Sequence, residues 1–372
     1  MFNYCVIMAG GSGTRLWPAS SSRKSKQFLP VQRGKGKTFF SLSLERAFKV
    51  IAKDGVVLVI AGNAHLPFII KDCSALSAAE KKRVVLIPEP QAKNTAPAIA
   101  CAVAYVRKTS GEDNSMLVLT SDHIIKPVSV FKKDMKKATG FAGHNQLVVF
   151  GITPSRPETG YGYIKTGKKL AESVYAVDAF QEKPDKKTAE KQIASKKFFW
   201  NSGMFAFNCE FMTEKFVEHA DDVIRPFEQL HAPGEKAYTK IKGVRVLNNW
   251  SGLARAYHQT KSISIDYAVI EKCSRTVMVH TAFEWIDVGN WDEYARLLSG
   301  NSAEVYTAGI CDNCFVDSDI PVALAGVEDL IVVIRSGKNG SPPAALIVKK
   351  GETQYVKDIV EQIKQTGKTE IL

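Results

Sequence analysis

Short, continuous hydrophobic runs recur through the first 150 positions and are separated by amphipathic stretches of helix length. Each run is rich in β-branched residues and lacks polar alternation, which is typical of a strand buried on both faces. The runs are YCVIMAG at 4–10, VVLVIAG at 56–62, VVLIPEP at 84–90, MLVLTSDH at 116–123 and LVVFGI at 147–152. They predict an α/β, Rossmann-like fold with a mostly parallel sheet. Ligands of such sheets lie at the carboxyl ends of the strands.

The pattern changes twice further along the chain. From 152 to 300 it becomes mixed, with a hairpin-like TGYGYIKTG and several helices, and no Ser/Gly linker separates this part from the first. Residues 1–300 are therefore predicted to form one large domain with a mixed, mostly parallel sheet. Residues 301–372 contain short strand-like runs between glycine turns and end in a helix near 353–365, which predicts a small, mainly-β domain.

The composition is that of an ordinary globular protein. The chain has 372 residues, of which 45% are hydrophobic and 24% charged. No apolar run approaches the roughly 18 residues of a membrane span, and no basic segment precedes the first apolar run, as one would in a signal peptide. The odd number of cysteines, seven, favours reduced thiols over a disulfide framework. We therefore expect a cytoplasmic protein that does not bind membranes.

The net charge of +12 is concentrated near the N-terminus. Residues 1–50 contain nine Lys and Arg and one Glu, which gives +8. This excess lies in and after a glycine loop, rather than along a helix or an aromatic-studded sheet as in a dedicated nucleic-acid surface. A compact polyphosphate is the expected partner, and nucleic acid is not.

Three glycines and an arginine follow the first predicted strand, in GGSGTRLWP. Gly10, Gly11 and Gly13 allow a tight turn whose N–H groups face phosphate oxygens, and Arg15 adds a bidentate cationic donor. The loop matches neither the Walker sequence nor the dinucleotide fingerprint, and a purely structural turn is the alternative. In SSRKSKQFLP, Lys26 precedes an apolar turn and is expected to reach into a cleft; a solvated basic loop is the alternative.

Two aspartates are candidates for a magnesium site. Asp122 ends the run MLVLTSDH, and Asp287 lies in EWIDVGNW between apolar and glycine residues. Magnesium prefers a few carboxylates together with phosphate oxygens. The alternative role of each aspartate is a helix N-cap. We expect His123 to pack beside the site, because a single histidine without a partner seldom marks a metal site.

A series of motifs, in order along the chain, resembles one protein family. The motifs are GGSGTRLWP, KQFLP, EPQAKNTAPAIA, SDHII, TGYGYIK, FQEKPD, WNSGMFAF, SIDYAVIEK and WIDVGNW. Together they resemble the sugar-nucleotide pyrophosphorylases, in particular the mannose-1-phosphate guanylyltransferase branch. The resemblance covers about 3–300 and is weaker beyond. It implies that 1–300 is a nucleotidyltransferase domain that converts GTP and mannose 1-phosphate into GDP-mannose and pyrophosphate with Mg²⁺.

The resemblance also implies roles for individual residues. Arg15 and Lys26 are expected to hold phosphates as catalytic residues, and Asp122 and Asp287 to form the metal pair. The residues expected to bind nucleotide are Gly10, Gly11, Ser12, Gly13, Thr14, Glu89, Pro90, Asn94, Thr95 and Asp122. The residues expected to bind mannose 1-phosphate are Gly160, Tyr161, Gly162, Glu182, Lys183, Asn201 and Asp266.

The chemistry of several of these side chains leaves alternatives open. The Glu182 carboxylate can accept sugar hydroxyls and the Lys183 ammonium can pair with the 1-phosphate, but EKP is also compatible with an ordinary strand end. Asn201 can donate and accept, or it lies on a bulged core strand. Asp266 either contacts sugar or caps a helix. Asn94 and Thr95 also fit a helix cap, so the choice of guanine depends mainly on the resemblance.

Two positions depart from the family pattern, which has proline where this chain has Ser25 and arginine where it has Lys93. Lys93 keeps the charge but loses the planar fork of arginine. The tail resembles a truncated β domain that assists dimerisation in relatives, so we expect a homodimer. The long form of the family continues into a phosphomannose isomerase domain, and we expect a single activity here. Alternatives are another nucleotide or hexose specificity, a non-catalytic sensor of GTP or GDP-mannose, and a nucleic-acid binder.

Overall fold

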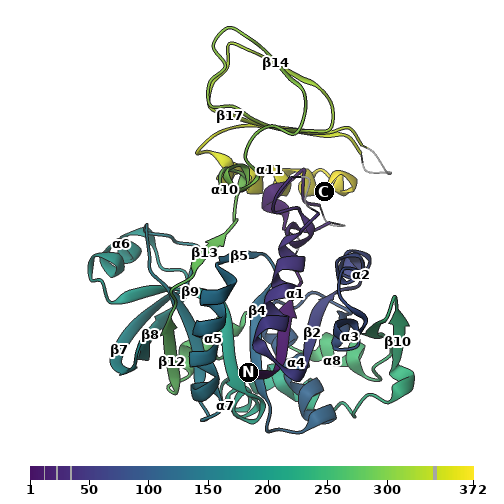
Figure 1. The fold of residues 1–372 in the computed structure, drawn as a ribbon, viewed down its shortest axis with the longest axis vertical. Helices are drawn as coiled ribbons and strands as arrows, with labels where there is room; N and C mark the ends of the chain where they lie inside the picture. Colours follow the sequence, from purple (N-terminus) through teal and green to yellow (C-terminus); the bar gives the residue numbers. More distant parts are fainter. Residues whose placement is uncertain (12, 22–23, 34–35, 338–341) are drawn as a thin grey trace. The chain divides into compact units, whose positions relative to one another are not determined.

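The computed structural model describes residues 1–11, 13–21, 24–33, 36–337 and 342–372. It divides the chain into two compact units (Figure 1). Unit 1 comprises Met1–Gly10, Ser43–Ser121 and Ile125–Trp285, and unit 2 comprises Gly11–Leu42, Asp122–Ile124 and Ile286–Leu372. The glycine loop after the first strand thus begins in unit 1 with Gly10, and from Gly11 onward it belongs to the same unit as the C-terminal residues that were expected to form the small domain.

Unit 1 is built on one mixed sheet of eleven strands in the order β10-β11-β3-β2-β1-β4-β9-β6-β12-β8-β7. The strands are β1 Phe2–Met8, β2 Ile51–Gly62, β3 Val84–Glu89, β4 Ser115–Thr120, β6 Leu147–Ile152, β7 Tyr163–Ala171, β8 Val174–Gln181, β9 Phe198–Asn208, β10 Tyr238–Ile241, β11 Val244–Leu247 and β12 Thr276–His280. The strands β1 to β4 are parallel, as expected from their continuous hydrophobic runs. Antiparallel β9 lies between β4 and β6.

Unit 1 also contains helices, some of which supply buried side chains to its hydrophobic core. They are α2 Leu66–Cys73, α3 Ala78–Lys81, α4 Thr95–Ser110, α5 Val128–Ala142, α6 Lys186–Ala194, α7 Cys209–Glu228, α8 Leu253–Gln259 and α9 Ile265–Ala268, while α1 Phe39–Val50 begins in unit 2 and ends in unit 1. All residues of α4 from Ala96 to Val106 are buried, because its small side chains let it lie between the sheet and α7.

The carboxyl ends of the first four strands lie at one edge of the sheet. Met8 at the end of β1 pairs with Ile60 of β2 and Thr120 of β4, and Gly62 pairs with Glu89 at the end of β3. This register brings Gly10, Glu89 and Ser121 to the same edge, where ligands bind in parallel sheets.

Within its described residues, unit 2 contains a two-stranded sheet, a three-stranded sheet and two complete α-helices. Its strands are β14 Val305–Ala308, β15 Phe315–Ser318, β16 Val322–Ala325, β17 Leu330–Arg335 and β18 Ala344–Lys349, and its helices are α10 Trp291–Leu298 and α11 Val356–Gln365. The short helices η1 Thr14–Leu16 and η2 Lys26–Phe28 belong to the same unit. The indole N–H of Trp17 donates to the Ile371 carbonyl at 2.7 Å, and that of Trp291 donates to the Trp17 carbonyl at 2.9 Å. These bonds fasten the segment after the glycine loop to the C-terminal residues.

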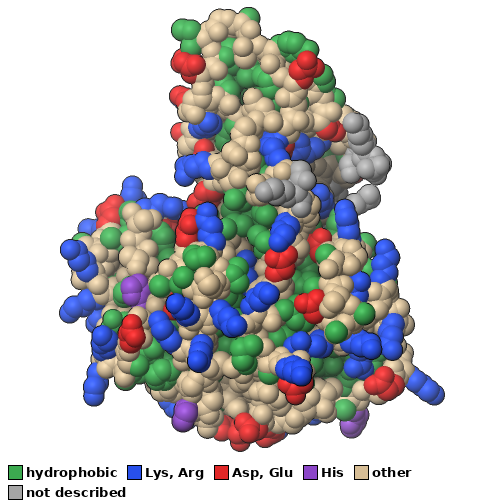
Figure 2. All heavy atoms as spheres, in the orientation of Figure 1, with side chains coloured by type: hydrophobic (Ala, Val, Ile, Leu, Met, Phe, Trp, Pro, Cys, Tyr) green, Lys and Arg blue, Asp and Glu red, His purple; other side chains and the backbone are tan. Residues whose placement is uncertain are grey.

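The α/β fold with a strand-rich C-terminal region is confirmed. Among the described residues, no helix is both long and apolar enough to cross a bilayer. All seven cysteines are free, and five of them are buried. On the face drawn in Figure 2, Lys and Arg side chains are spread over the surface with Asp and Glu among them.

Candidate active site

A cavity of about 250 Å³ in unit 2 brings together charged groups from four segments of the chain. Its lining residues are Gly13, Thr14, Arg15, Leu16, Lys26, Asp122, Asp287, Val288 and Gly289. Four of them are ionisable side chains, two cationic and two anionic. The arrangement collects the phosphate-holding and metal-holding candidates of the sequence in one place.

The glycine loop takes a form that other residues would not adopt. Gly13 has a φ of 56°, and a Cβ there would lie 2.5 Å from the backbone nitrogen of Lys26 and 2.8 Å from its Cβ. Gly11 has a φ of 92° but no neighbour within 4 Å of such a Cβ. Gly11 is therefore needed for its conformation, and Gly13 for both conformation and space. Ser12 lies outside the described residues.

Lys26 lies between the two aspartates. Its Nζ is 3.0 Å from Asp122 Oδ2 and 2.8 Å from Asp287 Oδ1, and its side chain is only 9% exposed. Burial alone would lower the pKa of the Lys26 ammonium, but the two carboxylates outweigh burial and raise it above the ordinary value. Lys26 is thus held as a cation inside the cavity.

The two aspartates are brought together by a small pair of strands. Asp122 directly precedes β5 His123–Lys126, Asp287 ends β13 Glu284–Asp287, and these two strands pair with each other. Burial on its own would raise the pKa of Asp122, but the charge of Lys26, then that of His123, lowers it to about 2. Neither aspartate caps a helix, so the N-cap alternative does not hold in this structure.

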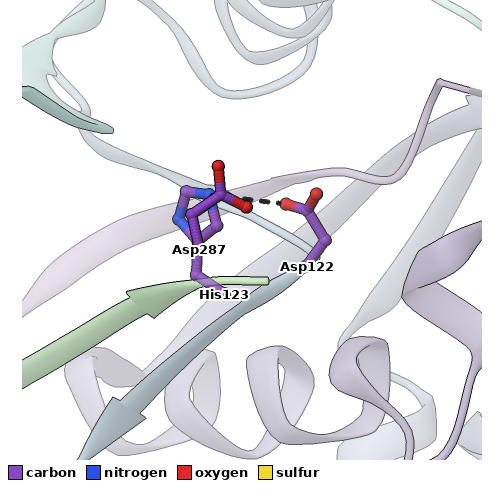
Figure 3. Close-up of side chains that lie close together, drawn as sticks. All are labelled: Asp122, His123 and Asp287. Atoms are coloured by element: carbon purple, nitrogen blue, oxygen red, sulfur yellow. Dashed lines mark ion pairs between the residues drawn. The ribbon is translucent and has the colours of Figure 1, made fainter. Parts of the chain in front are cut away.

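His123, which the sequence predicted to pack beside the site, lies close to both aspartates. Its Nε2 lies 3.6 Å from Asp122 Oδ1 and 3.8 Å from Asp287 Oδ1, and the three side chains point toward one another (Figure 3). One ligand atom from each lies within 4.8 Å of the others, so the group could hold a metal ion. The signal was its position next to Asp122, but nothing in the local pattern shows that Asp287 is near.

Arg15 is exposed and lines the same cavity from helix η1. Together with Lys26 it gives the cavity two positive charges, while Asp122 and Asp287 give two negative ones. A bound divalent cation would neutralise the carboxylates and leave both basic side chains for anionic oxygens. The cavity can therefore hold a metal ion and phosphate groups together.

Two of the nucleotide candidates in unit 1, Gly10 and Pro90, lie beside Glu89. A Cβ on Gly10 would lie 3.4 Å from Glu89 Oε2, so the backbone at Gly10 passes close to this carboxylate. The Tyr257 hydroxyl donates to Glu89 Oε1 at 3.2 Å. Burial raises the pKa of Glu89 to about 7, although the bond from Tyr257 opposes the rise. Pro90 is exposed beside it.

Asn94 and Thr95 have structural partners. The Asn94 side chain caps α4 by accepting from the Thr95 backbone at 2.8 Å, and Thr95 Oγ1 accepts from the Ile265 backbone at 2.9 Å. The Asn94 bond matches the capping alternative, whereas Thr95 is the first residue of α4 and its side chain bonds to Ile265 instead. A nucleotide contact by either side chain stays a prediction. The Lys93 ammonium donates to the Thr260 carbonyl at 3.2 Å.

The sugar candidates form a connected cluster in unit 1. The Lys183 ammonium pairs with Glu182 Oε1 at 2.8 Å, and Asn201 Nδ2 donates to Asp266 Oδ1 at 3.0 Å. Burial, then the charge of Glu182, raises the pKa of Asp266 to about 7. A Cβ on Gly162 would lie 2.6 Å from Glu182 Oε2, so only glycine leaves this carboxylate its place.

The backbone of the TGYGYIK motif completes this cluster. The Gly162 carbonyl accepts from the Asn201 backbone at 2.8 Å, and the Tyr161 carbonyl accepts from the Lys183 backbone at 3.2 Å. The Tyr161 ring lies edge-on between Trp200 and Trp285, with centroids 5.3 Å away in each case. The Gly160 N–H donates to Glu158 Oε1 at 3.2 Å. Six of the seven candidates are thus joined by direct contacts, and Gly160 lies beside them in the chain.

Known proteins are similar to this chain over nearly its whole length. Residues 4–302 match the nucleotidyl transferase family. The mannose-1-phosphate guanylyltransferase of Klebsiella pneumoniae is 33% identical, with 98% of this chain and 74% of the relative covered. The xanthan biosynthesis protein XanB of Xanthomonas campestris pv. campestris is 34% identical with the same coverage. A crystal structure described as a mannose-1-phosphate geranyltransferase from Thermus thermophilus matches with a TM-score of 0.77 and 30% identity, covering 98% of this chain and 100% of that one.

Proposed function

We propose that this chain, which belongs to the nucleotidyl transferase family and within it to the mannose-1-phosphate guanylyltransferases, transfers GMP from GTP to mannose 1-phosphate and releases pyrophosphate. The observation that carries the proposal is the cavity in which the Lys26 ammonium lies between Asp122 and Asp287 behind a glycine turn. In this reaction an oxygen of the sugar phosphate attacks the α-phosphorus of GTP in line with the departing pyrophosphate. Such a transfer needs positioning and charge neutralisation more than a protein nucleophile.

Mg²⁺ is the proposed metal, held by Asp122 and Asp287. Mg²⁺ prefers oxygen ligands and keeps several of its waters. The two carboxylates lie within reach of one cation and supply such oxygens, and their side chains, 35% and 25% exposed, leave room for water. When bound, Mg²⁺ would neutralise negative charge on the phosphate groups of GTP and mannose 1-phosphate around the α-phosphorus. His123 would then lie against the two carboxylates, where its imidazole can orient them.

The phosphates of GTP are assigned to the glycine turn and the basic side chains. Backbone N–H groups from Gly10 to Gly13 can face phosphate oxygens, and Arg15 can bind them through two nitrogens. With a metal ion held by the two carboxylates, the Lys26 ammonium would be available to pair with a phosphate oxygen. Glu89 is the side chain proposed to accept the N1–H and N2–H groups of guanine, which uracil and thymine do not offer together.

Mannose 1-phosphate is assigned to the cluster around Glu182. Its carboxylate would accept sugar hydroxyls, Lys183 would pair with the phosphate, and Asn201 would read a hydroxyl as donor or acceptor. Asp266 supports this role, because it already accepts a hydrogen bond from Asn201 and so fixes the direction of that amide.

A substrate panel tests the proposal. The purified protein is incubated with Mg²⁺ and each pairing of GTP, ATP, UTP or dTTP with mannose 1-phosphate or glucose 1-phosphate, and pyrophosphate is measured. We expect the highest turnover with GTP and mannose 1-phosphate. Equal or better turnover with UTP or glucose 1-phosphate would reject the assigned specificity. Binding of GTP without pyrophosphate release would instead make the protein a sensor.

Further proposals concern the cellular location, the oligomeric state, the binding partners and the domain division of the enzyme. A cytoplasmic location suits seven free thiols, since disulfides form mainly in oxidising compartments. We also propose a homodimer, no binding of nucleic acid or membranes, and a functional division near residue 300. Gel filtration with light scattering tests the dimer, and expression of 1–300 alone tests the division.

A further inference from the structure

Glu271 contacts the sugar candidates, although it was not among the site residues that the sequence predicted. It lies in the SIDYAVIEK motif, after Asp266, in the short helix η5 Ile270–Lys272. Its Oε1 accepts a hydrogen bond of 2.8 Å from the backbone N–H of Glu182, which is 89 positions away in the chain. A hydrogen bond from an N–H group to a carboxylate is charge-assisted and therefore stronger than one between neutral groups.

The backbone at Glu182 and Lys183 has an unusual conformation. The chain bends at these two residues directly after β8. Lys183 has a φ of 48°, in the left-handed region that residues other than glycine seldom adopt. The Lys183 N–H donates to the Tyr161 carbonyl at 3.2 Å, and the Glu182 N–H donates to Glu271. Hydrogen bonds on two consecutive N–H groups hold this bend, and the bend sets the direction in which the two side chains leave the backbone.

The Glu182 carboxylate has little room to move. Its side chain is only 7% exposed, and its Oε1 is 2.8 Å from the Lys183 ammonium. Its Oε2 would lie 2.6 Å from a Cβ on Gly162, so it passes very close to that glycine. A shift of the Glu182 backbone would therefore press the carboxylate toward Gly162 or draw it away from Lys183. The position of both charged groups depends on the bond that Glu271 makes.

One short segment, α9 followed by η5, holds two parts of the sugar cluster. Asp266 of α9 accepts a hydrogen bond of 3.0 Å from the Asn201 side chain of β9, and Glu271 of η5 holds the backbone that follows β8. The segment is itself anchored in the unit 1 core by four buried residues, Ile265, Ala268, Val269 and Ile270. Glu271 therefore projects from a fixed support, as a residue that positions others requires.

We propose that Glu271 is a positioning residue for mannose 1-phosphate. By holding the Glu182 backbone, it directs the Glu182 carboxylate toward the sugar hydroxyls and the Lys183 ammonium toward the phosphate. This inference rests on the proposed function, which assigns those two side chains to the sugar phosphate. Glu271 acts through them and does not touch the reacting atoms. Its removal should therefore weaken the binding of the sugar substrate and leave the binding of GTP unchanged.

Steady-state kinetics of three variants test the proposal, with the KM for each substrate and the unfolding temperature measured separately. Glu271→Ala removes the hydrogen-bond acceptor, and Glu271→Gln keeps an acceptor oxygen without the charge. Glu214→Ala is the matched control, because it removes an exposed glutamate from α7 in the same unit. Both variants at position 271 remove a charge that, after burial and Glu182, raises the pKa of Asp266. A difference between them therefore isolates the hydrogen bond.

Glu271→Ala should raise the KM for mannose 1-phosphate about threefold to tenfold, as expected for the loss of one hydrogen bond. Its KM for GTP should stay at the wild-type value. The KM of Glu271→Gln for mannose 1-phosphate should lie between those of the wild type and Glu271→Ala, and Glu214→Ala should match the wild type. An unchanged KM for mannose 1-phosphate in Glu271→Ala would overturn the proposal. So would an equal rise in both KM values, because a purely structural role would not favour one substrate.

Isothermal titration calorimetry with GDP-mannose and with GTP separates this inference from the proposed function. Glu271→Ala should bind GDP-mannose about threefold or more weakly than the wild type, and should bind GTP with wild-type affinity. If the wild type has no transferase activity, the proposed function fails, but the difference in GDP-mannose affinity still tests the role of Glu271. Equal affinities of the two proteins for GDP-mannose would overturn that role even in an active enzyme. A wild type that does not bind GDP-mannose would overturn both.

Discussion

Replacement of Lys26 by methionine removes the cation that two carboxylates share. Its Nζ is 3.0 Å from Asp122 and 2.8 Å from Asp287, and the lysine side chain is almost completely buried. At an effective dielectric constant of about 20, unit charges 4 Å apart interact with about 4 kcal/mol. Removing one partner of a buried ion pair costs about 3–5 kcal/mol. Because the carboxylates are a quarter to a third exposed, water compensates part of this loss, and we expect about 2–3 kcal/mol.

This loss should lower the unfolding temperature by about 4–10 °C in metal-free buffer at neutral pH. Millimolar Mg²⁺ should raise the unfolding temperature of Lys26→Met more than that of the wild type. The reason is that the ion replaces the missing cation in the variant, whereas it must displace an ammonium in the wild type. Differential scanning calorimetry with and without EDTA measures both effects.

Lys357→Met is the matched control, since it removes an exposed lysine from α11 in the same unit. It should unfold close to the wild-type temperature and respond to Mg²⁺ as the wild type does. Equal unfolding temperatures for Lys26→Met and Lys357→Met, with an equal response to Mg²⁺, would refute the reasoning.

Three further predictions concern the proposed catalytic and sugar-binding residues. Asp122→Asn and Asp287→Asn should each reduce turnover at least tenfold without unfolding the protein, and a near-normal rate would remove that residue from the metal site. Gly13→Ala should reduce turnover far more than Gly11→Ala. Both glycines have positive φ, but only at position 13 would a Cβ lie 2.5 Å from a backbone atom. Similar turnover in the two variants would contradict this prediction. The pKa of Asp266 is raised from 3.8 to about 7 in the folded state. Between these two values the folded state holds a proton that the unfolded chain has lost, so the stability of the wild type should fall as the pH rises from about 4 to about 7. In Asp266→Asn the urea midpoint should depend less steeply on pH across that range than in the wild type, and an unchanged slope would exclude the effect.

Local patterns were enough to predict the strands of the first half. Both faces of β3 and β6 are buried, so every residue in each is buried and the runs stand out from the helices between them. The pairing of distant segments was not predictable in this way. Antiparallel β9, which follows β4 only after several intervening elements, inserts between β4 and β6, and a hydrophobic period carries no information about which strands will be neighbours.

The same limit applies to the candidate site. Motif chemistry singled out Lys26, Asp122 and Asp287, although 96 and 261 positions separate the lysine from the two aspartates, and the fold places all three in one cavity. That His123 lies close to Asp287 was not predictable, because the two residues are distant in sequence.

Diffraction from crystals soaked with Mn²⁺ and GTP would test the central claim most directly, because Mn²⁺ substitutes for Mg²⁺ and gives an anomalous signal. The account predicts one strong anomalous peak within coordination distance of both Asp122 and Asp287, with the triphosphate against the glycine turn and Arg15. A manganese peak away from both aspartates, or a triphosphate bound elsewhere, would contradict it.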